Sequence, residues 1–340
     1  MNGNLLVSNS GKSTPQYIPV INSLRGLAAV VVCIFHLICL PLNFLENTAI
    51  YHFAPYGRYG VQIFFFVITG VVIPIALINS NYNYTLFWRF IYKRIVRIEP
   101  PYICSILAGI VLLLLHNQFL SKTPHDFPSI KSLLLHIGYL IPFVKGEQWF
   151  IIVFWTMAVE FQFYILISLL FPLLVNRNFV IRMVSYLTVF GLALCLRSTI
   201  YAPVWLPIFM IGIIYISFRS AKISLIEFGI ILFVSAIFGL ILHNFIIAII
   251  AIITIGIIHF FSAFQCKLGN FFGNISYSLY LTHTLFGSAT INFFVPHVSD
   301  LYAKLLVVGM GFIVSILTAY FFHSWIEKPF QKYASRIKLA

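Results

Sequence analysis

Residues 19–40, PVINSLRGLAAVVVCIFHLICL, decide the fold class of this chain. A helix needs roughly 20 predominantly apolar residues to cross the hydrocarbon core of a bilayer, and this stretch is long enough. It nevertheless contains a cationic side chain, Arg25, and an imidazole, His36. The stretch therefore predicts a transmembrane helix that carries two polar side chains at membrane depth.

Apolar stretches of this kind recur along the whole chain. Of the 340 residues, 61% are hydrophobic and only 9% are charged, which is more apolar surface than a soluble domain can hide from water. The stretches that we expect to span the membrane are 19–40, 60–79, 98–117, 149–175, 182–201, 203–218, 223–242, 244–263, 275–294 and 302–324. The predicted fold class is all-α, with one polytopic domain of about ten transmembrane helices at 18–330, an N-terminal segment at 1–17 and a C-terminal tail at 331–340.

The placement of Lys and Arg predicts the orientation of the chain. The net charge is +13, and the charges sit in short clusters between the apolar stretches, which argues against a nucleic-acid-binding surface. Cytoplasmic loops carry an excess of Lys and Arg, and most of the 21 lie on the side of the N-terminus when successive helices alternate in direction. Both termini are therefore expected in the cytoplasm. The five cysteines lack metal-ligand spacing, so no metal site is expected.

Arg25 and His36 share one face of the first expected helix. They are 11 residues apart, which is about 1100° of rotation, within about 20° of three full turns, and a rise of about 16.5 Å. The arginine lies nearer the cytoplasm and the imidazole nearer the outer leaflet. An imidazole titrates near neutral pH and suits removal of a proton from a hydroxyl, although a histidine that only hydrogen-bonds between helices is the alternative.

Glu160 is a second polar residue at membrane depth, near the middle of the stretch 149–175. A buried carboxylate is neutralised or needs a cation, and Arg25 is the partner that we expect. The pair could serve only to hold two helices together, or it could belong to a functional site, and both interpretations stay open here.

A basic cluster precedes the third expected helix: Trp88, Arg89, Lys93, Arg94 and Arg97. Arg94 and Arg97 are three residues apart and would share a helix face. The cluster can anchor the chain against anionic lipid on the cytoplasmic side. It can also form a phosphate site, because guanidinium groups bind phosphate in a bidentate manner.

Residues 274–283, NISYSLYLTH, bring hydroxyl groups and a histidine to the start of the ninth expected helix. Such groups commonly hydrogen-bond between transmembrane helices, and packing accounts for most of them. His283 is the residue of this stretch that we single out for testing.

Together these segments resemble acyltransferase family 3, a family of membrane-bound carbohydrate O-acetyltransferases. The resemblance rests on six motifs in order: 21–29 with 35–37, 57–70, 94–97 with Pro100 and Tyr102, 149–164, 276–283 and 326–330. Gln62, Phe161 and Thr282 stand where the family commonly has Asp, Glu and Trp.

The resemblance implies transfer of an acyl group, foremost acetyl, from cytoplasmic acyl-coenzyme A to a hydroxyl of an envelope or exported carbohydrate. It implies a multi-pass protein of the bacterial cytoplasmic membrane, with acyl-coenzyme A as donor substrate and no permanently bound cofactor. The expected partners are this donor, a carbohydrate or lipid-linked glycan acceptor, membrane lipid and a second copy of the chain. The expected site residues are His36, Arg25 and Glu160 for catalysis, and Arg94, Arg97, Tyr277 and His283 for donor binding.

Several alternatives remain at this point. His36 could act as general base, or it could form a transient acyl-histidine. The buried charges could instead line the path of a transporter for a glycan or lipid-linked oligosaccharide. A subunit that exchanges an acyl group with another protein is a third interpretation. Binding of acyl-coenzyme A would separate the enzyme from the transporter.

Overall fold

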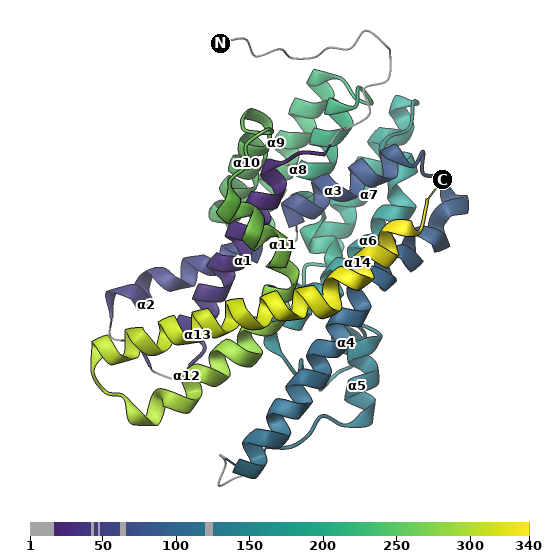
Figure 1. Ribbon diagram of the computed structural model, residues 1–340. Coiled ribbons are helices and arrows are strands. Elements are labelled where there is room, and N and C mark those ends of the chain that lie inside the picture. Colours follow the sequence, from purple (N-terminus) through teal and green to yellow (C-terminus); the bar gives the residue numbers. More distant parts are fainter. Residues whose placement is uncertain (1–16, 42–43, 47, 62–65, 120–124, 340) are drawn as a thin grey trace.

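The computed structural model of the chain describes residues 17–41, 44–46, 48–61, 66–119 and 125–339 (Figure 1). The regular structure of these residues is helical, which confirms the predicted all-α class. Its α-helices are α1 (Val20–Cys39), α2 (Ala49–Phe53), α3 (Ile68–Asn79), α4 (Phe87–Phe119), α5 (Ile130–Ile137), α6 (Trp155–Leu174), α7 (Phe179–Cys195), α8 (Ala202–Arg219), α9 (Leu225–Leu242), α10 (Phe245–Phe260), α11 (Lys267–Thr282), α12 (Ser288–Phe294), α13 (Leu301–Phe322) and α14 (Lys328–Arg336). Short 3-10 turns include η1 (Ala54–Tyr59) and η5 (Ile152–Phe154), and π-helical turns continue α11 as η6 (His283–Gly287) and α13 as η8 (His323–Glu327).

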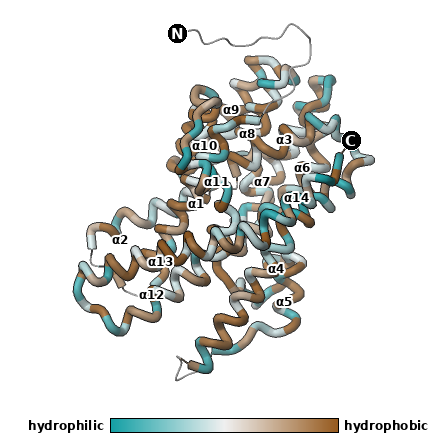
Figure 2. Tube along the Cα trace, in the orientation of Figure 1, coloured by the Kyte–Doolittle hydropathy of each residue, from teal (hydrophilic) through white to brown (hydrophobic). Residues whose placement is uncertain are grey.

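Within the described residues, six helical stretches are long and apolar enough to cross a bilayer. They are Val20–Cys39, Tyr84–Phe119, Ile152–Leu174, Ala202–Arg219, Leu225–Leu242 and Leu301–Arg336, and α3, α7 and α10 are apolar but shorter. Figure 2 shows hydrophobic residues along most helices and hydrophilic residues gathered at loops and around α14. The chain is therefore a membrane protein, while the count of ten crossings and the cytoplasmic termini stay predictions.

Each of the ten predicted stretches overlaps a helix, but several helices extend beyond their apolar part. α4 begins at Phe87 rather than near residue 98, so it includes the basic cluster. The helix expected at 275–294 begins as α11 at Lys267. The helix expected at 302–324 is α13, and it continues through η8 and α14 as far as Arg336. Hydropathy identifies only the apolar part of a helix. Backbone hydrogen bonding continues through polar residues that face the protein interior, so the helices are longer than the predicted stretches.

The helices form two groups, which contact each other through α4 and also where α1 meets α10 (Figure 1). In one group α1 packs along α11, and α13 lies against α11 and η6. In the other group α8 is enclosed by α3, α6, α7, α9 and α10, and it is the most buried of the candidate spans. α4 contacts α6 of the second group and α11 of the first, so side chains from both groups can face one space.

Glycines allow α1 and α11 to approach closely. A Cβ atom on Gly26 of α1 would lie 2.7 Å from the backbone nitrogen of Gly273 on α11. Small residues at such positions let the backbones of membrane helices come together. The close approach also includes Asn22, whose backbone oxygen would lie 2.1 Å from a Cβ atom on Gly273, so it extends on both sides of Arg25. Further along the same two segments, His36 and His283 are within side-chain reach of each other.

Candidate active site

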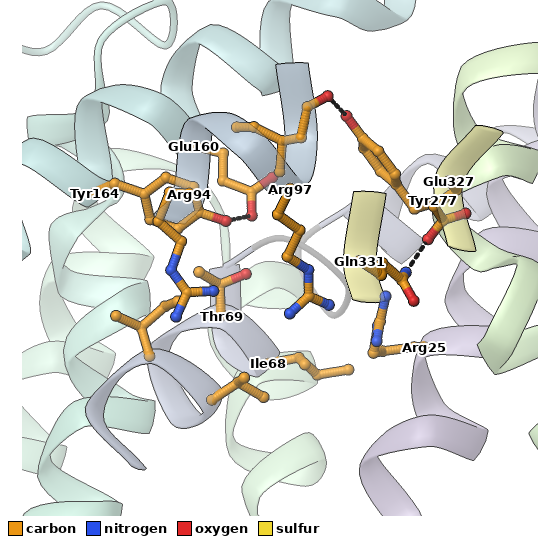
Figure 3. A pocket seen from close by; sticks show the side chains of 13 residues that line it. Arg25, Ile68, Thr69, Arg94, Arg97, Glu160, Tyr164, Tyr277, Glu327 and Gln331 are labelled. Carbon is orange, nitrogen blue, oxygen red and sulfur yellow. Dashed lines mark hydrogen bonds between the residues drawn. The ribbon is translucent and has the colours of Figure 1, made fainter. Parts of the chain in front are cut away.

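A small polar cavity lies where the two helix groups meet (Figure 3). Its volume is ≈ 80 Å³. The polar residues that line it are Arg25 from α1, Thr69 from α3, Arg94 and Arg97 from α4, Glu160 and Tyr164 from α6, Tyr277 from α11, Glu327 from η8 and Gln331 from α14. Five of the seven site residues predicted from the sequence therefore face one space, although they come from four different helices.

Arg94 is the most enclosed of the three arginines, with 6% of its surface exposed. Its guanidinium lies 5.2 Å from the ring centroid of Phe90 and 5.6 Å from that of Tyr164. Within the described part of the chain, its buried Nε–H group has no hydrogen-bond acceptor. A buried donor without an acceptor costs about 1–3 kcal/mol, so this site would gain from a ligand that supplies an anionic oxygen.

Glu160 and Arg25 lie on different sides of the cavity. Glu160 accepts a hydrogen bond from the hydroxyl of Tyr164, one helical turn further along α6. In the view of Figure 3, Arg97 stands between Glu160 and Arg25, and Glu327 and Gln331 lie on the side of Arg25. Two carboxylates and three guanidinium groups thus face the same space, and the expected pairing of Arg25 with Glu160 stays a prediction.

Glu327 is a cavity residue that the sequence analysis did not single out. It is fully buried, and its Oε2 atom accepts hydrogen bonds from the backbone N–H of Ser278 at 3.2 Å and from its hydroxyl at 2.6 Å. His323 lies 3.0 Å from the same oxygen, and Gln331 donates to Oε1. These bonds join η8 to α11. A carboxylate directly after a long apolar stretch was the signal that could have identified it.

Tyr277 joins α11 to α4. Its hydroxyl donates a hydrogen bond to the carbonyl of Ile98 at 2.8 Å. The tyrosine therefore has a clear packing role beside the cavity, and the predicted role in donor binding stays a prediction.

His36 lies outside the cavity and contacts His283. The Nδ1 atom of His36 is 2.8 Å from the Nε2 atom of His283, and the rings are stacked with centroids 5.0 Å apart. His36 is 9% exposed and His283 is 1% exposed. The structure thus separates the predicted donor-binding residue His283 from the arginines and brings it to the predicted base.

The two sites are linked along α11. Tyr277 lines the cavity, Tyr280 follows one turn later, and His283 one turn after that. The ring of Tyr280 lies 5.9 Å from that of His283, and its hydroxyl is 2.7 Å from the Oγ1 atom of Thr156 on α6. On α1 a rise of about 16.5 Å separates Arg25, which lines the cavity, from His36.

The three departures from the family pattern have different outcomes. Phe161 stacks on Tyr139 with ring centroids 5.0 Å apart. The hydroxyl of Thr282 donates to the carbonyl of Ser278 at 2.8 Å. Both residues pack within the protein, and Gln62 lies outside the described residues. In the described ranges no group of three or more His, Cys, Asp or Glu side chains is arranged to hold a metal ion.

Comparison with known proteins agrees with these motifs. A family model described as an acyltransferase domain matches residues 18–324. A similar protein is "Putative acetyltransferase ORF330" of Acidianus two-tailed virus, which is 28% identical over 214 residues, 60% of this chain and 59% of that protein. The chain therefore spans about three fifths of that relative's length. No solved structure matches the chain.

Proposed function

This chain belongs to acyltransferase family 3, whose model covers residues 18–324, and on that basis we propose that it transfers an acetyl group from acyl-coenzyme A to a hydroxyl of a carbohydrate. The observation that carries the proposal is the cavity lined by Arg25, Arg94 and Arg97. Arg25 lies on α1, the helix that also holds His36. Family membership supports a transferase over a transporter, for which buried charge alone is the argument.

The arginine cavity suits the anionic part of the donor. Coenzyme A carries phosphate groups, which guanidinium groups bind through charge-assisted hydrogen bonds. The cavity is small, with a volume of ≈ 80 Å³, which suits one such group. We therefore assign one donor phosphate to Arg94 and Arg97, and the nucleotide to the protein surface, where Lys328 and Lys332 are exposed on either side of the cavity residue Gln331.

The acyl end of the donor would then extend from Arg25 toward His36. In this mechanism His36 removes the proton from the acceptor hydroxyl, and the hydroxyl oxygen attacks the thioester carbonyl carbon. The carbon–sulfur bond breaks, the sulfur leaves with its electron pair, and the protonated imidazole returns the proton to it. The products are the O-acyl carbohydrate and coenzyme A with a free thiol. Formation of an acyl-histidine remains the alternative route.

The proposed setting is a bacterial cytoplasmic membrane, with the arginine cavity toward the cytoplasm and the histidine pair toward the outer leaflet. A carbohydrate or lipid-linked glycan would approach from the outer side. The excess of Lys and Arg on the side of the termini supports this orientation.

Mass spectrometry of surface glycans tests the function, with cells that carry the gene compared with cells that lack it. We expect O-acetyl groups on a glycan only when the gene is present. Identical glycans, together with no binding of acetyl-coenzyme A to the purified protein, would contradict the proposal. Binding of a glycan without acetyl-coenzyme A would favour the transporter.

A further inference from the structure

His283 stands at the first residue of the π-helical turn η6, and both nitrogens of its ring have partners. Its Nδ1 atom lies 2.8 Å from the carbonyl oxygen of Leu279. Its Nε2 atom lies 2.8 Å from Nδ1 of His36. π-Helical turns are frequent at functional sites, and this one begins at a buried imidazole.

The carbonyl of Leu279 determines which nitrogen of His283 carries the proton. A carbonyl oxygen only accepts hydrogen bonds, so Nδ1 of His283 is the donor. In a neutral imidazole the other nitrogen is then an acceptor, so Nε2 of His283 accepts from His36. A charged imidazole would be costly at a side chain that is 1% exposed.

The same reasoning passes to His36. Because Nε2 of His283 accepts, Nδ1 of His36 must donate, and the proton of the neutral ring is held there. With the opposite tautomer of His36, two unprotonated nitrogens would face each other at 2.8 Å. Nε2 of His36 is therefore the ring nitrogen that is left unprotonated, which is the form that a general base requires.

Resting on the proposed function, we propose that His283 is a positioning residue that holds His36 in the Nδ1-protonated tautomer and in the orientation for proton removal. When Nε2 of His36 takes the proton from the acceptor hydroxyl, the ring becomes cationic. Its Nδ1–H still donates to Nε2 of His283. The leaving sulfur then receives the proton from Nε2 of His36, and His283 keeps its own proton throughout.

The positions of the two rings do not depend on this hydrogen bond alone. Leu37, next to His36, and Leu279, one turn before His283, are fully buried in one apolar cluster between α1, α11 and α13. A substitution of His283 should therefore change the protonation of His36 more than the packing of the helices.

Kinetics of two variants test the proposal. His283→Gln supplies an amide oxygen that can accept from His36, whereas His283→Leu supplies no acceptor. We expect His283→Leu to lower kcat by about 100-fold or more, within the range of general base catalysis, with KM for acetyl-coenzyme A within about twofold of wild type. His283→Gln should retain kcat within about tenfold. Equal activity of the two variants, or full activity of His283→Leu, would overturn the proposal.

A second measurement reads the tautomer without activity. ¹⁵N NMR of the histidine-labelled protein in membranes, with His36→Ala used for assignment, should show a protonated Nδ1 and an unprotonated Nε2 on His36 of the wild type. His283→Leu should shift this balance, and a protonated Nε2 in the wild type would refute the inference. If His36→Ala itself remains active, the proposed function fails instead, so the two failures are distinguishable.

Discussion

Replacement of Arg94 by Met tests the assignment of the cavity to an anionic donor. Met keeps much of the side-chain length but removes the charge and the buried Nε–H donor, which lacks an acceptor among the described residues. We expect donor binding to weaken strongly and stability to change little, and this combination separates a binding role from a structural one.

The expected loss of affinity for acetyl-coenzyme A can be estimated from the hydrogen bond that Arg94→Met removes. A hydrogen bond to a charged group contributes about 1.5–3 kcal/mol. Loss of one such bond from Arg94 to a donor phosphate would raise Kd for acetyl-coenzyme A by about 10- to 150-fold. Arg94→Lys, which keeps the charge without the planar fork, should give an intermediate value.

The stability of the ligand-free protein should change little. Met loses the contacts of the guanidinium with Phe90 and Tyr164, which contribute about 0.5–2 kcal/mol. The substitution also removes a buried donor that lacks an acceptor, and this stabilises the variant by about 1–3 kcal/mol. We expect the free energy of unfolding to fall by no more than about 1 kcal/mol, because the two contributions nearly cancel.

Calorimetric titration of acetyl-coenzyme A into the purified protein in nanodiscs, with thermal unfolding of the same samples, measures both effects. Arg219→Met is the matched control, since Arg219 is exposed at the end of α8. An unchanged Kd for Arg94→Met would refute a donor site at this cavity. Unchanged Kd together with a large loss of stability would show that Arg94 serves the fold alone.

Two further predictions concern the scaffold. Glu227→Ala should lower the free energy of unfolding by about 3–5 kcal/mol, because it leaves the buried guanidinium of Arg182 without the carboxylate that it contacts at 2.6 Å. Thermal unfolding measures the change, activity per folded molecule should be unaltered, and a loss below 1 kcal/mol would contradict the account. Gly26→Val should destabilise the protein by about 1–3 kcal/mol and lower acylation, because the added side chain forces α1 away from Gly273 on α11. Gly229→Val is the control, since a Cβ there meets nothing within 4 Å, and equal effects of the two variants would disprove the close-approach argument.

Properties that depend on neighbouring residues were predictable from the sequence. The stretch 19–40 predicted a helix that the structure has at Val20–Cys39. Polar side chains at membrane depth indicated that Arg25 and Glu160 have a structural or functional role. That they share one cavity with Arg94 and Arg97 of α4 became visible only in the structure. Length, helical period and the cost of burying charge are short-range properties, so one sequence is enough to use them.

Contacts between distant segments were not predictable in the same way. His36 and His283 are 247 residues apart, and their contact depends on how closely α1 and α11 pack. Hydroxyls and a histidine in one stretch indicate a polar helix face, but the period does not say which other helix that face meets. The resemblance grouped His283 with the donor-binding residues, whereas its side chain contacts His36. Glu327 was overlooked for the same reason, since its partner Ser278 lies on another helix.

The proposed acyl transfer to a carbohydrate hydroxyl depends on His36. The most direct test measures O-acetyl groups by mass spectrometry on surface glycans of a deletion strain that expresses the wild type, His36→Ala, or the exposed control His259→Ala at equal levels in the membrane. We expect O-acetylated glycan with the wild type and with His259→Ala, and none with His36→Ala. Retention of O-acetyl groups at wild-type levels with His36→Ala would show that His36 is not the general base.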